Sequence, residues 1–147
     1  MIRIGTIEDV YVINRIFTTP EVLSFHANNP ELEYDFTRAL QEDNCIFLIN
    51  DTNDAMSMWE PIPGNYYEGH SMFTNTCRGR RGLETGKAMM RFLYDELNVR
   101  KAIGHTPISN LAARKFSRML GFKSEGFKTS SVGIVEMFVY DWNNLSK

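Results

Sequence analysis

Residues 66–97 read as a strand followed by a helix, joined by a stretch rich in glycine and basic side chains. The stretch runs Thr76-Cys-Arg-Gly-Arg-Arg-Gly-Leu-Glu-Thr-Gly-Lys-Ala-Met89. Glycines let a backbone turn tightly so that its N–H groups point at an anion, and the dipole of the following helix adds about half a positive charge. The segment therefore predicts a phosphate-binding turn between a strand and a helix.

The spacing of this stretch excludes two common phosphate-binding loops. A Walker A loop needs Gly-x-x-x-x-Gly-Lys-Ser/Thr, whereas here Arg81 stands at its first glycine and Ala88 follows Lys87. The dinucleotide fingerprint Gly-x-Gly-x-x-Gly also fails, because the glycines are spaced differently. Hydrolysis of a nucleoside triphosphate is therefore disfavoured.

What remains resembles the acyl-CoA-binding loop of the GNAT acetyltransferases, whose pattern is Arg/Gln-x-x-Gly-x-Gly/Ala. Gly86 matches the last position and Arg81 the first, while Glu84 takes the place of the central glycine. In this register Glu84 either faces a diphosphate or turns outward. A slipped register makes Gly82 central, but it then puts Glu84 last and Gly79 where the arginine belongs.

A second segment, Asn110-Leu-Ala-Ala-Arg-Lys-Phe-Ser-Arg-Met-Leu-Gly-Phe122, resembles the Asn-x-x-Ala helix of the same family, which ends in Gly-Phe. Its apolar residues make one face of an amphipathic helix, and Gly121 is predicted to end it as a left-handed C-cap. In the family this helix packs beside the pantetheine arm, and its asparagine caps the helix or contacts the arm.

The resemblance implies acetyl-CoA (CoA) as the cofactor. The residues expected to bind it are Phe73, Thr74, Arg78, Gly79, Arg80, Arg81, Gly82, Leu83, Glu84, Thr85, Gly86, Lys87, Asn110 and Phe116.

Two side chains on the strand before the turn are candidates for a catalytic base. Because residues two apart in a strand share a face, Glu68 and His70 project together. A carboxylate and an imidazole can remove a proton from an attacking amine, directly or through water. Many members of the family have an acidic base on this strand, and phage-encoded members often show Glu-x-His there. The alternative is that the two residues simply pair with each other.

Two further roles follow from the resemblance alone. Relatives protonate the leaving thiolate with a tyrosine seven residues after the helix asparagine, where this chain has Ser117. A serine hydroxyl is shorter and less acidic than a phenol, but it can orient a water. A backbone N–H of Phe73 or Thr74 is expected to stabilise the oxyanion.

Hydrophobic periodicity predicts a mixed α+β fold in one domain, residues 1–147. The family has a central, mostly antiparallel sheet of six to seven strands flanked by about four helices, with the fourth and fifth strands splayed apart. We expect strands at residues 2–6, 44–50, 55–60, 66–74, 101–106, 123–128 and 132–141, and helices at 6–17, 31–42, after the basic turn, and at 110–120. The last strand could pair across a two-fold axis, giving a homodimer.

Composition narrows the functional classes. The net charge is -2, so anion binding must come from local clustering, and a nucleic-acid binder is disfavoured. Cys45 and Cys77 share no metal-ligand spacing, which indicates reduced thiols and no metal site. The sequence contains no apolar run long enough to span a membrane and no secretion signal, which predicts a cytoplasmic protein.

Three functions stay open after this reasoning, of which a nucleic-acid binder is the least favoured. The first is an N-acetyltransferase that moves an acetyl group from acetyl-CoA to a primary amine of a small molecule or peptide by direct attack. The second is a GNAT-fold accessory, or a phage virion or assembly protein, with weak or no catalysis. The substituted positions Glu84 and Ser117 favour the second.

Overall fold

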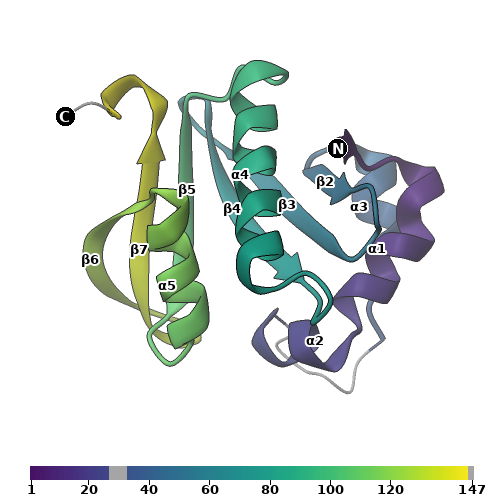
Figure 1. Cartoon of the computed structure of the whole chain (residues 1–147), viewed down its shortest axis with the longest axis horizontal. Helices are drawn as coiled ribbons and strands as arrows, with labels where there is room; N and C mark the ends of the chain where they lie inside the picture. Colours follow the sequence, from purple (N-terminus) through teal and green to yellow (C-terminus); the bar gives the residue numbers. More distant parts are fainter. Residues whose placement is uncertain (27–32, 146–147) are drawn as a thin grey trace.

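A computed structural model describes residues 1–26 and 33–145 of the chain. Seven strands form one sheet in the order β1-β2-β3-β4-β5-β7-β6 (Figure 1). β4 and β5 run parallel, and the other neighbouring strands are antiparallel. The strands are β1 (Ile2–Ile4), β2 (Ile46–Asn50), β3 (Ala55–Ile62), β4 (Tyr66–Phe73), β5 (Lys101–Pro107), β6 (Lys123–Ser130) and β7 (Gly133–Asp141).

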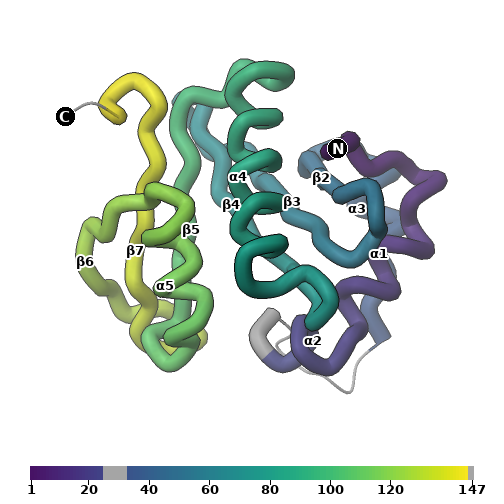
Figure 2. Tube along the Cα trace, in the orientation of Figure 1, coloured from purple at the N-terminus to yellow at the C-terminus, as the bar shows by residue number. Residues whose placement is uncertain are grey.

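Helices cover both faces of this sheet, as Figures 1 and 2 show. The α-helices are α1 (Val10–Phe17), α2 (Pro20–His26), α3 (Thr37–Glu42), α4 (Gly79–Asp95) and α5 (Leu111–Leu120), and two short 3-10 turns are η1 (Ile7–Asp9) and η2 (Trp142–Asn144). This architecture confirms the predicted mixed α+β fold.

The two faces differ in their core. On one face α4 supplies Met89, Met90 and Leu93, which pack with Trp59 and Phe73 from the sheet. The other face is covered by the first three helices. Its buried apolar residues are Ile13, Ile16, Phe17, Val22, Phe47, Ile49, Met56 and Met72. Alternation along each strand therefore feeds two cores, one on each side of the sheet.

Helix α5 begins and ends where the sequence predicts. The Asn110 side chain accepts a hydrogen bond from the Ala113 N–H (3.2 Å), so it is the N-cap. Gly121 ends the helix at φ 105°, in the left-handed region that favours glycine.

The prediction for the region between the first helix and β2 is wrong in two ways. The helix expected at residues 31–42 begins at Thr37; its first two residues lie outside the described part of the chain, and residues 33–36 are not helical. The helix α2 was not predicted, although Thr19 followed by Pro20 is a helix-start signal, since proline suits the first helical position.

The last strand, which was expected to pair across a two-fold axis, does not lie at an edge of the sheet. β7 lies between β5 and β6, so the edges of the sheet are β1 and β6. β6 carries a register shift between Ser124 and Phe127. Such bulges protect sheet edges from pairing with another chain, so this edge gives no support for a dimer.

The parallel strands at the centre of the sheet separate along their length. Within the described residues, β4 and β5 pair only over 66–68 and 101–103, ending with Glu68 opposite Ile103. β4 continues to Phe73 and β5 to Pro107 without further pairing between them. The splay expected between the fourth and fifth strands is therefore present.

Candidate functional site

The basic stretch forms the N-terminus of α4, with less of a turn than the sequence suggests. The helix begins at Gly79, which has a φ of 61° that disfavours any residue with a side chain. The N–H of Gly82 already donates to the Arg78 carbonyl (3.2 Å). The first three amides, those of Gly79, Arg80 and Arg81, have no acceptor inside the helix and are the ones available to an anion.

The other two glycines of the stretch serve packing and do not form a turn. A Cβ at Gly82 would lie 2.9 Å from the Cys77 carbonyl oxygen. A Cβ at Gly86 would lie 2.8 Å from the Phe116 ring and 2.9 Å from a Leu120 methyl group. These glycines bring α4 against the preceding loop and against α5. The phosphate-binding turn expected through residue 87 is instead helical from Gly79 onward. The sequence did not reveal this, because close packing and tight turning both select glycine.

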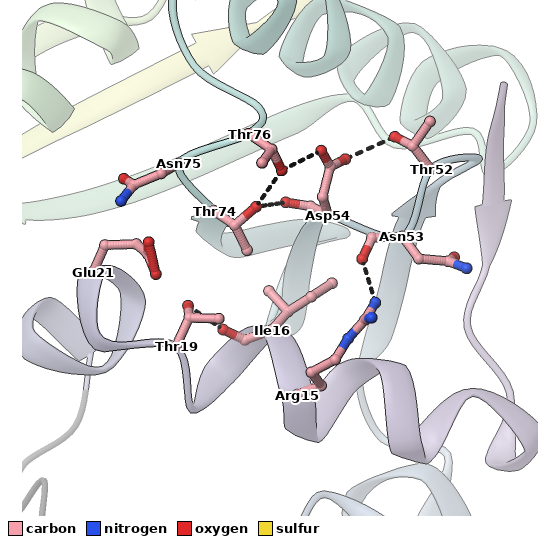
Figure 3. Close-up of a pocket in the computed structure, with 10 residues that line it drawn as sticks. All are labelled: Arg15, Ile16, Thr19, Glu21, Thr52, Asn53, Asp54, Thr74, Asn75 and Thr76. Atoms are coloured by element: carbon pink, nitrogen blue, oxygen red, sulfur yellow. Dashed lines mark hydrogen bonds between the residues drawn. The ribbon is translucent and has the colours of Figure 1, made fainter.

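Arg81 is held by the turn between β2 and β3. Its Nη1 donates to Asp54 Oδ2 (2.7 Å) and to the Thr76 carbonyl (2.5 Å), and its Nη2 donates to Asp54 Oδ1 (3.2 Å) and to Thr52 Oγ1. Figure 3 shows Asp54 between Thr52 and Thr76. The guanidinium therefore ties α4 to the hairpin turn, a role that the sequence did not indicate.

Hydrogen bonds and charge lower the pKa of Asp54. The Arg81 guanidinium is the largest cause, burial opposes it, and hydrogen bonds from Asn50, Thr76 and Thr52 add to the lowering. A lowered pKa in the folded state means that the carboxylate stabilises the protein above its ordinary pKa of 3.8, and that this stability is lost as the pH falls through the folded value.

We therefore expect Asp54→Asn to be less stable than the wild type at neutral pH, and the difference to shrink below about pH 4. Melting temperatures of the two proteins across a pH series measure this. Asp51→Asn is the control, because Asp51 is an exposed residue in the same turn. A gap that stays constant into acid would contradict the assignment.

Glu84 pairs with an arginine in the first turn of α4. Its Oε1 accepts from Arg80 Nε (3.2 Å) one helical turn earlier, and both side chains are exposed. The carboxylate therefore lies on the outer face of α4. Arg78, Lys87 and Arg91 are also exposed.

Backbone groups of β4 face the splay. The Thr74 N–H donates to the Asp54 carbonyl (3.0 Å) on the β3 side. Successive N–H groups of a strand point to opposite sides, so those of Phe73 and Ser71 point toward β5, which has moved away. Of the two predicted oxyanion donors, Thr74 is already engaged and Phe73 faces the gap. Ser71 also faces it, and the sequence prediction missed it.

On the sheet face opposite α4, a carboxylate and an imidazole bridge the separating strands. Glu68 Oε1 lies 2.7 Å from His105 Nδ1, with the side chains 28% and 25% exposed. His105 follows Ile103, the last residue of β5 that pairs with β4, by two positions. His105 was not predicted as a site residue.

The expected partner of Glu68 has a different neighbour. His70 Nε2 lies 4.0 Å from Glu60 Oε1 on β3, beyond hydrogen-bonding distance. Glu60 is directly opposite Glu68 in the sheet register. Glu68 and His70 thus share a face as predicted, but the close contact of Glu68 is with β5.

The α5 residues lie on the α4 side of the splay. The rings of Phe116 and Phe73 meet edge to face, with centroids 5.5 Å apart. Phe116 therefore packs on the last residue of β4. Ser117 follows it in the helix and is partly buried.

A pocket of about 330 Å³ lies beside the Arg81 contact (Figure 3). Its lining residues are Arg15, Ile16, Thr19, Glu21, Thr52, Asn53, Asp54, Thr74, Asn75 and Thr76. It opens between α1, α2 and the loop before α4. The Glu68 and His105 pair is not part of its lining.

No group of three or more His, Cys, Asp or Glu side chains among the described residues could hold a metal ion. No helix in that part of the chain has the length and apolarity needed to cross a membrane.

Comparison with known proteins gives matches among solved structures. No protein-family model matches the sequence, and no curated protein matches it. An aminoglycoside acetyltransferase in complex with coenzyme A and kanamycin has a TM-score of 0.79 at 14% identity, covering 97% of this chain and 95% of the other. A GNAT-family acetyltransferase from Bacillus anthracis has a TM-score of 0.74 at 14% identity, with coverage of 97% and 95%.

A chimera of the spermidine N-acetyltransferase SpeG from Vibrio cholerae has a TM-score of 0.79 at 12% identity, covering 99% of this chain and 96% of the other. At these identities the likeness concerns the fold. The chain has the fold of the GNAT acetyltransferases over nearly its whole length.

Proposed function

We propose that this protein is an N-acetyltransferase that moves the acetyl group of acetyl-CoA to a primary amine by direct attack. One observation carries the proposal: β4 and β5 separate after Glu68 and Ile103. Beyond that point the backbone amides of β4 on the β5 side have no strand partner, on the strand that leads to the basic N-terminus of α4. The fold shared with acetyltransferases, one of them bound to coenzyme A, supports it.

The residues at the start of α4 fit the diphosphate of CoA. The amides of Gly79, Arg80 and Arg81 point out of the helix N-terminus, where the helix dipole favours negative charge. The Arg78 side chain is exposed at the N-cap. Glu84 is exposed and its charge is paired with Arg80.

Within the splay, β4 and α5 supply the groups that orient the thioester. Acetyl-CoA brings an acetyl group activated as a thioester. The Ser71 N–H, or that of Phe73, stabilises charge on the carbonyl oxygen. Glu68 lies on the acceptor side and serves proton removal from the amine. Ser117 of α5 is our candidate for supplying a proton to the departing sulfur.

The acceptor is a primary amine on a small molecule or peptide. Structural neighbours are named for an aminoglycoside and for spermidine, which are small-molecule amines. We place the reaction in the cytoplasm, because Cys45 and Cys77 are free thiols.

Calorimetric titration with acetyl-CoA tests the proposal. We expect binding, and Arg78→Ala should weaken it about tenfold, because it removes a charged hydrogen-bond donor to phosphate. Arg91→Ala is the matched control, since this exposed arginine lies on the same helix but far from its N-terminus. The absence of heat at high micromolar acetyl-CoA would overturn the enzyme reading.

An accessory role with weak or no catalysis remains the second candidate. The observation that favours it is the engagement of Arg81, the arginine of the family motif, with Asp54. A virion or assembly role would be compatible with a GNAT shell that binds CoA poorly. The titration and an assay for free CoA thiol together separate the two. Only the enzyme must both bind acetyl-CoA and release the thiol when an amine is present.

A further inference from the structure

We propose that His105 is the general base of the reaction and that Glu68 acts through it as a positioning residue. This inference rests on the proposed acetyl transfer and identifies the group that removes the proton from the attacking amine. The carrying observation is the 2.7 Å contact between Glu68 Oε1 and His105 Nδ1 across the point where β4 and β5 separate.

The contact with Glu68 determines which ring nitrogen of His105 can act as the base. A carboxylate accepts a hydrogen bond, so Nδ1 carries the proton and the neutral ring keeps its lone pair on Nε2. Nε2 lies on the ring edge away from Glu68. A base whose tautomer and orientation are set by a buried carboxylate is the arrangement of the serine-protease triad. Glu68 and His105 are both partly buried, at 28% and 25% exposed.

Position along the strands favours His105 over Glu68 as the group nearest the reaction. The last pair between β4 and β5 is Glu68 with Ile103. Two residues further along each strand, where the strands no longer pair, are His70 and His105. The Ser71 N–H, which faces the gap, is one residue beyond that level. Glu68 lies three residues before Ser71, about 10 Å along the strand.

The other imidazole on this face lacks an orienting bond. His70 Nε2 is 4.0 Å from Glu60 Oε1, too far for a hydrogen bond. The remaining charged group on this face of β5 is Lys101, whose ammonium lies over the Tyr66 ring, 4.8 Å from its centroid. Charged groups on this face of the sheet thus include Glu60, Glu68, His70 and Lys101, together with Asp141 of β7 opposite Lys101.

The proton balance of the step is complete without another reactant. A neutral amine nitrogen forms a bond to the acetyl carbonyl carbon, and the carbon–sulfur bond breaks with its electron pair going to sulfur. The proton that the nitrogen loses passes to His105 Nε2, the departing sulfur takes a proton from Ser117, and exchange with water returns both side chains to their starting forms. The products are an amide and the CoA thiol, and His105 returns to its starting form.

The test measures acetyl transfer and CoA binding in parallel for wild type, His105→Ala, Glu68→Gln and His70→Gln. We expect His105→Ala to lower kcat roughly a hundredfold or more, Glu68→Gln to lower it on the order of a hundredfold, and neither to change CoA binding. His70→Gln replaces the other imidazole of these strands, which has no orienting hydrogen bond, and it should cost far less turnover than His105→Ala. Added imidazole should restore part of the activity of His105→Ala, which a merely structural role would not allow.

The pH profile gives a second readout that does not depend on how well a variant folds. The wild-type kcat/KM should rise with pH as the base loses its proton. An active wild type without that rise, or a folded His105→Ala with near wild-type turnover, would overturn the inference and leave the proposed function standing. A wild type that binds no acetyl-CoA and acetylates no amine would instead overturn the proposed function.

Discussion

Replacing Glu136 by alanine is expected to lower the free energy of unfolding by about 3 kcal/mol. The side chain is 1% exposed and accepts hydrogen bonds from Arg114 Nε (2.9 Å), Arg118 Nη2 (2.5 Å) and Ser124 Oγ (2.6 Å). Its loss leaves two arginines of α5 facing the sheet without their shared anion. For a chain of this length the melting temperature should fall by about 10 °C.

The pH dependence of the same comparison provides a further check. Burial raises the pKa of Glu136, but hydrogen bonds from Ser124, Arg114 and Arg118 outweigh it, so the pKa lies below its ordinary 4.5. The stability that Glu136 contributes is therefore present above that value and lost as the pH falls through the folded pKa. Glu125→Ala, at an exposed position of β6, should have a free energy of unfolding within about 0.5 kcal/mol of the wild-type value. Equal melting of both variants at neutral pH would refute the buried ion pair.

The fold could be predicted where a local signal coincides with a motif that resembles one of the GNAT family. α5 shows this, because Asn110 and Gly121 are a cap and a stop that act within the helix itself. The strand order was harder to read. Placing β7 inside the sheet depends on its pairing with β5, and alternation within a strand does not reveal its neighbours.

The candidate site could be predicted only in part, for similar reasons. The pattern of β4 correctly put Glu68 and His70 on one face, since that requires only the period of a strand. The close partner of Glu68 is His105, 37 positions later, and their contact depends on the register between β4 and β5. No local pattern encodes that register.

The basic stretch shows a different limit. Gly86 was read as part of a phosphate-binding turn, and it lies where Phe116 and Leu120 of α5 approach α4 closely. A missing Cβ serves both purposes, so glycine spacing alone does not separate them. Arg81 was read in the same way, and its contact with Asp54 depends on a hairpin turn that is 27 residues away in the chain.

Replacing Ser71 by proline should reduce kcat by roughly a hundredfold or more, if the proposed acetyl transfer is correct. The Ser71 N–H points into the splay, where β5 no longer pairs with β4. It is therefore placed to stabilise charge on the carbonyl oxygen of the thioester, and proline has no N–H to offer. Steady-state turnover with saturating acetyl-CoA and amine measures the change.

The position suits this substitution because it removes a backbone donor that holds no strand partner. Proline is tolerated where an N–H faces away from a ladder, so we expect Ser71→Pro to fold. Ser71→Ala keeps the N–H and loses only an exposed hydroxyl, so it should turn over near the wild-type rate. If Ser71→Pro folds and acetylates as fast as Ser71→Ala, the charge is stabilised elsewhere. Phe73, the other β4 residue whose N–H faces the gap, would then be the next donor to replace.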